Sequence, residues 1–142
     1  MSKQVLDVHQ MQHLQELGLE LKKDTILVWA RFMLGKTSIS DWEIAYNHST
    51  ITDNSQTIPA YTLQDVLDAL PKEIKYKDKR CWLCIDLADE WVGYYYENIH
   101  FAQKYVYYEI VKVDESLIDA AYKLLCWCIE DGYVETNKND EV

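Results

Sequence analysis

The first recognisable pattern along the chain is a short amphipathic helix. Val8, Met11 and Leu14 recur at the three-to-four-residue spacing of one helical face. Asp7 stands directly before them, where its carboxylate can accept hydrogen bonds from the unpaired backbone N–H groups of a helix start. The apolar stripe ends at Leu17, just before a glycine, and it is narrow. We therefore expect a short helix that is half exposed.

The next pattern predicts a β-hairpin. Residues 25–33 are apolar at both odd and even positions and rich in aromatic and β-branched side chains, which favours a strand. Residues 39–47 alternate instead, with Trp42, Ile44 and Tyr46 on one face and acidic side chains on the other. Alternation of this kind is typical of a strand with one buried face and one wetter face.

A second helix carries the clearest local signal. It follows residues 48–57, which are polar, show no regular period and predict a loop. Thr62 and Asp65 form a variant of the capping box that begins many helices. One apolar face then consists of Leu63, Val66, Leu67 and Leu70. Pro71 ends the helix, because the residue before a proline disfavours helical geometry.

Three more strands and a last helix complete the chain. The strands are predicted over residues 80–87, 91–97 and 104–113. Ser116 can cap a helix that ends at Asp131, before a glycine. Few positions of this helix are polar after its first turn, so we expect it to be largely buried.

The element order α-β-β-α-β-β-β-α predicts an antiparallel α+β fold. Hairpins dominate this order, and no helix alternates repeatedly with strands as it would in a parallel sheet. We expect a sheet of about five strands with two or three helices. Residues 1–134 are predicted to form a single domain and residues 135–142 a flexible acidic tail.

Composition narrows the function classes. A formal net charge of −10 repels phosphate backbones and anionic membranes. Because no long apolar run exists and the first ten residues lack the apolar stretch of a signal peptide, we expect a cytoplasmic protein with no membrane partner. The usual glycine-rich phosphate loops and nucleophile motifs are absent, so the sequence gives no support for an enzyme and none for a cofactor.

Four cysteines can serve as packing residues with reduced thiols. They are Cys81, Cys84, Cys126 and Cys128. The first two are three apart on a predicted strand and the other two are two apart on a predicted helix, so each pair diverges. We therefore expect neither a metal site nor a redox site from them.

One short segment departs from the acidic character of the chain. Its basic residues are Lys72, Lys75, Lys77, Lys79 and Arg80. Together with two acidic residues they give a local net charge of +3. Nucleic acid is therefore not an expected partner of this chain except through these side chains, with Tyr76 as a stacking ring. The alternative is a solvated connector between a helix and a strand.

Three side chains of the first predicted helix have the spacing of a weak metal site. His9 and His13 stand four residues apart, and Glu16 follows three residues later, a spacing by which a helix presents ligands to zinc. No general base lies between the two histidines, in contrast to the H-E-x-x-H motif. The alternative is an exposed polar helix face.

The aromatic residues give the strongest functional indication. The chain holds 11 Tyr and 5 Trp. Trp82, Tyr105 and Tyr107 fall at strand positions opposite the more apolar face. Trp29 and Tyr95 can continue the same face, which predicts a Trp- and Tyr-bearing surface of the kind enriched at protein interfaces. The alternative is a sheet face covered by the first helix or by cross-strand tyrosine pairs.

Two stretches resemble a known group of proteins. Residues 58–71 (IPAYTLQDVLDALP) and 117–134 (LIDAAYKLLCWCIEDGYV) are similar to segments of small uncharacterised proteins of gut bacteria and their prophages or other mobile elements. The resemblance covers most of the chain after Asp24. It implies an accessory or mobile-element origin and no catalytic residue.

Three functions are therefore open at this point. The first is a non-enzymatic cytoplasmic interaction protein that binds a protein partner, or a second copy of itself, through its Trp- and Tyr-rich sheet face. The second is an acidic inhibitor that imitates nucleic acid and binds a DNA- or RNA-processing protein. The third is a small metal-dependent enzyme that uses His9, His13 and Glu16.

Overall fold

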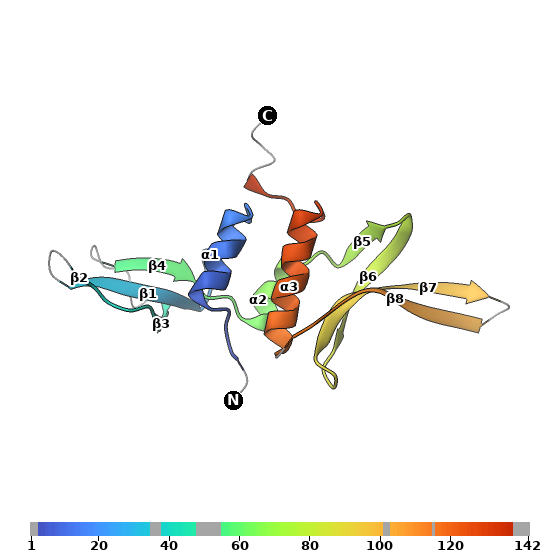
Figure 1. Ribbon diagram of the computed structural model, residues 1–142, viewed down its shortest axis with the longest axis horizontal. Coiled ribbons are helices and arrows are strands. Elements are labelled where there is room, and N and C mark those ends of the chain that lie inside the picture. The colour runs from blue at the N-terminus through green and yellow to red at the C-terminus, as the bar shows by residue number, and fades with distance from the viewer. Residues whose placement is uncertain (1–2, 35–37, 48–54, 101–102, 115, 138–142) are drawn as a thin grey trace.

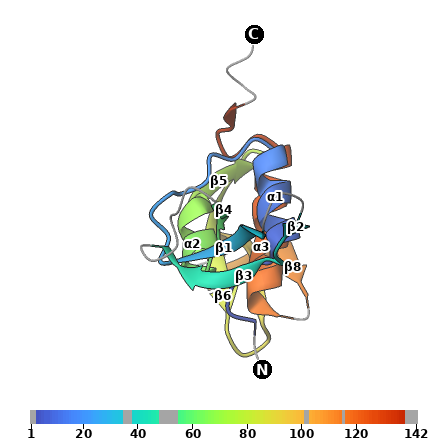
Figure 2. The same ribbon diagram turned by 90° about the vertical axis from the view of Figure 1, so that its left-hand side faces the viewer.

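Three helices lie between two antiparallel sheets along the long axis of the molecule (Figure 1). The computed structural model describes residues 3–34, 38–47, 55–100, 103–114 and 116–137. The helices are α1 (Val8–Glu16), α2 (Leu63–Ala69) and α3 (Leu117–Glu130). Seen along the long axis, the same elements overlap within a narrow outline (Figure 2), so the molecule is elongated.

The first sheet is built around one central strand. Its strands are β1 (Leu27–Leu34), β2 (Ser38–Ile39), β3 (Glu43–Tyr46) and β4 (Ser55–Pro59). Trp29 of β1 pairs with Ile44 of β3 and also with Ile58 of β4, which places β1 between these two strands. The short strand β2 forms a hairpin with the end of β1.

The second sheet is a meander whose strands follow one another in chain order. They are β5 (Glu73–Tyr76), β6 (Lys79–Asp86), β7 (Trp91–His100) and β8 (Gln103–Val113). Lys77 and Asp78 connect β5 to β6 with φ angles of 51° and 63°. Two consecutive left-handed residues are the mark of a type I′ turn, whose twist suits a two-residue hairpin. The pairing register of β7 with β8 shifts between Tyr94 and Tyr95.

The predicted α+β class is confirmed, and the element order roughly matches. The strands are divided between two sheets, however, where one sheet of about five strands was expected. Strands β4 and β5 were not predicted: part of β4 was expected to be loop, and β5 was expected to be a solvated connector. Each of the two strands has one buried side chain, Ile58 and Ile74 respectively. Alternation this short leaves little periodic signal in a sequence.

The expected burial of one face of the second predicted strand is wrong in part. Trp42 packs against the hydrophobic core, but Ile44 is 41% exposed and Tyr46 is 61% exposed. Both residues belong to β3, which pairs only with β1 among the described strands and thus lies at a sheet edge. Ile58 of β4, on the other side of β1, is buried, and α1 contacts β4, so the core covers the β4 side of this sheet and leaves β3 at its margin.

A single hydrophobic core joins the three helices to both sheets. α3 contributes the largest share, since its buried residues lie on more than one side of the helix: Ile118, Ala120, Ala121, Leu124, Leu125, Cys128 and Ile129. α1 adds Met11 and Leu14, and the second sheet adds Val92 and Tyr94. α3 contacts α2, β7 and β8 directly. The core therefore lies around α3, in the middle of the molecule.

Local hydrogen bonds begin each helix where the sequence predicts. Asp7 and Gln10 form a complete capping box at the start of α1, and Thr62 and Asp65 form another at the start of α2. Ser116 accepts a hydrogen bond from a backbone N–H of the first turn of α3. Caps of this kind satisfy N–H groups that have no partner within the helix.

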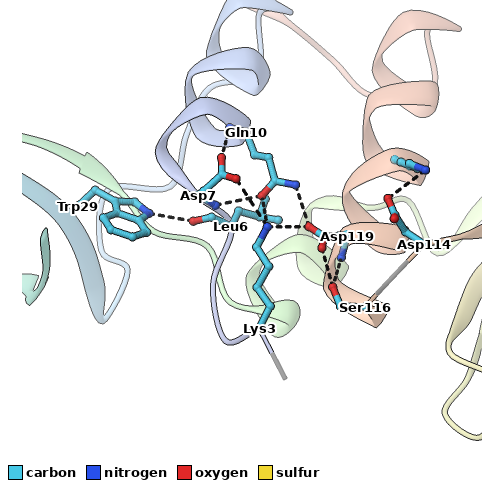
Figure 3. A network of polar contacts seen from close by, with 9 residues as sticks. Lys3, Leu6, Asp7, Gln10, Trp29, Asp114, Ser116 and Asp119 are labelled. Atoms are coloured by element: carbon cyan, nitrogen blue, oxygen red, sulfur yellow. Dashed lines mark hydrogen bonds and ion pairs between the residues drawn. The ribbon is translucent and has the colours of Figure 1, made fainter. Parts of the chain in front are cut away.

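A polar network ties the N-terminal segment to α1, α3 and β1 (Figure 3). Lys3 Nζ donates to Asp119 Oδ1 at 2.7 Å, and Gln10 Nε2 donates to the same oxygen at 2.8 Å. Trp29 Nε1 donates to the carbonyl oxygen of Leu6 at 2.8 Å. The network thus connects two helices and one sheet that the sequence separates by up to 116 positions.

The carboxylate of Asp119 is stabilised in its charged form. Burial by itself raises the pKa of Asp119, but the hydrogen bonds from Gln10, Lys3 and Ser116 outweigh burial and hold the pKa below the ordinary value of 3.8. A lowered pKa means that the ionised carboxylate is more stable in the folded state than in the unfolded state. Asp119 therefore contributes stability above its ordinary pKa, and this contribution is lost as the pH falls through its folded-state pKa.

We expect the substitution Asp119→Asn to lower the free energy of unfolding by about 2 kcal/mol at about pH 7, because the charged acceptor of the network is removed. The difference from the wild type should shrink as the pH falls from 3.8 through the lower pKa of the folded state, because the wild-type carboxyl then becomes neutral as well. Urea unfolding of both proteins across this pH range measures the difference. Asp41→Asn, at an exposed position, is the matched control and should change little. A difference that stayed constant with pH would contradict this account.

Candidate interaction face

The second sheet has one face on the core and one face turned away from it. Ile74, Cys81, Val92 and Tyr94 are buried on the inner face. Residues directly opposite in an antiparallel pair share a face, and residues two apart on a strand do so as well. The outer face, as defined here by register, consists of Glu73, Lys75, Arg80, Trp82, Cys84, Asp86, Trp91 and Tyr95.

Two aromatic rings lie next to each other at the centre of the outer face. Trp82 of β6 pairs with Tyr95 of β7, and their ring centroids are 6.0 Å apart at an interplanar angle of 44°. Both side chains are half-buried. Such a pair is worth about 1 kcal/mol beyond the area that it buries.

A charged pair borders these rings. Arg80 donates from Nη2 to Glu73 Oε2 at 3.1 Å and from Nε to the other carboxylate oxygen. Its guanidinium carbon lies 5.7 Å from the centre of the Trp82 ring. The hydrogen bonds and the charge of Arg80 lower the pKa of Glu73, so both groups keep their charge at neutral pH. The outer face thus combines two half-buried rings with a guanidinium that is held by bidentate hydrogen bonds to Glu73.

The basic segment is a hairpin, and its side chains are not all on the outer face. Lys75 and Arg80 pair across the two strands and share that face. Lys79 lies on the other face, where its Nζ is 4.3 Å from the ring centre of Tyr96 and donates to the hydroxyl of that residue at 3.1 Å. Lys72 donates to the carbonyl oxygen of Leu67 at 3.3 Å, which satisfies a carbonyl at the end of α2. Lys77, in the turn, is 5.1 Å from the ring of Tyr76.

The structure brings together two of the five aromatic residues that the sequence proposed. Trp82 and Tyr95 are in contact, as described above. Trp29 does not join them, because it belongs to the first sheet and donates its indole N–H to Leu6. Tyr105 pairs with Asn98 and Tyr107 pairs with Tyr96 along the backbone, and the side chains of these two candidates lie outside the described part of the chain.

The histidine candidates do not converge into a metal site. His13 Nδ1 lies 3.9 Å from Glu16 Oε2, and the His13 ring packs edge-on against Tyr122 at 6.3 Å. In the part of the chain that the structure describes, no three His, Cys, Asp or Glu side chains gather as they would around a metal ion. The interpretation of His9, His13 and Glu16 as a chelate is therefore not supported by their geometry.

The four cysteines are free thiols, and two of them belong to the core. Cys81 and Cys128 are completely buried, as expected for packing residues. Burial, together with the nearby carboxylate of Asp131, raises the pKa of Cys128 to about 11, although a hydrogen bond with Tyr94 opposes this. Burial also raises the pKa of Cys84 on the outer face. The thiols of Cys84 and Cys128 are therefore protonated at neutral pH and weakly nucleophilic.

Comparison of the chain with protein-family models, with curated proteins and with solved structures finds no match. Among the residues that the structure describes, no helix has the length and apolar character needed to cross a membrane.

We expect Trp82→Ala to lower the free energy of unfolding by only about 1 kcal/mol, because Trp82 is half-buried on the outer face and mainly contacts Tyr95 and Arg80. Leu124→Ala, in the completely buried part of α3, should cost about 3 kcal/mol. Denaturant unfolding followed by circular dichroism measures both. Should Trp82→Ala unfold the protein, Trp82 belongs to the core and the outer face has been assigned incorrectly.

Proposed function

We propose that this protein is a non-enzymatic interaction protein of the cytoplasm that binds a protein partner through the outer face of its second sheet. The observation that carries the proposal is the half-buried Trp82–Tyr95 pair with the guanidinium of Arg80 beside it. Trp, Tyr and Arg are the residue types that dominate binding energy at protein interfaces.

The arrangement of the pair favours binding over a purely structural role. Both rings stand on paired strands of a sheet whose inner face is fixed by the core, so little conformational entropy is lost when a partner covers them. Arg80 is already oriented by Glu73, which leaves its position defined before a partner arrives. A rigid aromatic centre with a polar border is the usual composition of an interface.

Substitution of an aromatic residue on the outer face should abolish partner capture. Substitution of a half-buried tryptophan elsewhere in the chain should not. We expect affinity capture from cells that naturally make the protein to retain a partner with the wild type and to lose it with Trp82→Ala and with Tyr95→Ala. Trp42→Ala is the control, because Trp42 is also half-buried but belongs to the first-sheet region. Capture of the same partner by Trp82→Ala would contradict the proposal. Sedimentation of the purified protein tests whether a second copy is the partner.

The salt dependence of the captured complex separates this function from imitation of nucleic acid. An aromatic interface should keep its affinity between about 0.05 M and about 0.5 M salt, because apolar burial is not screened by ions. An acidic mimic, which uses the net charge of −10, should lose affinity steeply over the same range. Titration of the purified partner at both salt concentrations measures this. A steep loss would replace the aromatic face by the acidic surface as the binding site.

A further inference from the structure

A cavity of about 490 Å³ lies between α1, the segment that follows it and the first sheet. It is separate from the outer face of the second sheet, and none of its lining residues belongs to that sheet. Its volume falls within the range of sites that hold small organic molecules.

One cationic side chain is held in place at the cavity wall. The guanidinium carbon of Arg31 lies 4.5 Å from the centre of the Trp42 ring, and Arg31 Nε donates to Gln56 Oε1 at 2.6 Å. These two contacts orient the planar group but use only one of its nitrogens as a donor. In the part of the chain that the structure describes, no carboxylate forms an ion pair with Arg31. The two terminal nitrogens are thus available for an anionic group.

The charge balance of the lining favours a single negative charge. Arg31 and Lys23 are the cationic residues of the wall, and Glu20 is its acidic residue. The wall therefore carries a net charge of about +1 within a chain of net charge −10. A carboxylate matches this balance and the planar fork of arginine better than a doubly charged phosphate does.

The rest of the lining is suited to an apolar body with a few polar groups. Leu19, Leu21, Ile58 and Pro59 provide the apolar part of the wall. Gln12, Gln15 and Asn137 provide amide groups that can donate or accept hydrogen bonds. Apolar walls with a small number of polar groups are typical of ligand sites.

We propose that this cavity binds a small organic monocarboxylate, with its carboxylate on the terminal nitrogens of Arg31 and its apolar part against the aliphatic wall. Trp42 and Gln56 act as positioning residues, because they hold the guanidinium at its place before the ligand enters. This binding does not depend on the outer face of the second sheet and goes beyond the interaction proposed for that face.

The test uses 3-phenylpropionate as the probe and its neutral amide, 3-phenylpropanamide, as a probe of nearly the same shape. Nuclear magnetic resonance titration of the full chain, up to about 10 mM probe, measures saturable shifts at the Trp42 indole and the Gln56 side-chain amide. We expect the carboxylate to bind roughly tenfold or more tightly than the amide, because only the carboxylate pairs with Arg31. This comparison uses the wild-type protein and does not depend on the folding of any variant.

Variants of two arginines locate the binding. Arg31→Gln should weaken carboxylate binding roughly tenfold or more and bring it to the level of the amide, whereas Arg31→Lys should retain part of it. Arg80→Gln, at the exposed arginine of the other sheet, should bind as the wild type does. Equal binding of acid and amide, unchanged binding by Arg31→Gln, shifts located at Trp82, or no saturable shift at all would each overturn the proposal.

Discussion

Burial of α3 is the constraint on which the rest of the structure depends. This helix has buried side chains on more than one side, so a single covering element cannot keep it from water. α2, β7 and β8 contact it directly, and Asp119 connects it to α1 and the N-terminal segment. Each completely buried leucine of the helix contributes about 2 kcal/mol. The positions of both sheets are therefore set by their packing against this central core.

The same constraint explains why Trp29 and Trp82, which the sequence assigned to one face, have different surroundings. Each sheet packs one face against the core, so the contacts of a strand residue depend on whether the core or a neighbouring segment covers its side chain. Trp29 is used by the N-terminal segment, whose carbonyl at Leu6 accepts its indole N–H. Trp82 contacts another half-buried ring and an exposed guanidinium instead. The difference lies in tertiary contacts and not in strand parity.

Local patterns could be predicted from the sequence, whereas contacts between distant segments could not. The N-cap at Asp7 and the capping box at Thr62 were predicted correctly, because each depends on residues within the first turn of its helix. The parity of Trp82 was predicted for the same reason, since alternation along one strand is local. The division into two sheets and the pairing of Trp29 with distant segments depend on contacts far apart in the chain, which periodicity does not contain. The cavity wall belongs to this second class, because Arg31, Gln56 and Asn137 come from widely separated segments.

The position of Asn137 links the end of the chain to the cavity. Its backbone N–H donates to the carbonyl oxygen of Gly18 at 2.8 Å, and Asn137 also lines the cavity. Among the described residues, Tyr133 and Val134 are the last that pack against the core, so the hydrogen bond of Asn137 is an attachment separate from the core. A ligand that contacts Asn137 is therefore thermodynamically coupled to docking of the C-terminal segment, and each must strengthen the other by the same factor. A chain that ends before Asn137 would lack this coupling between ligand binding and docking of the C-terminal segment, while its hydrophobic core would remain complete.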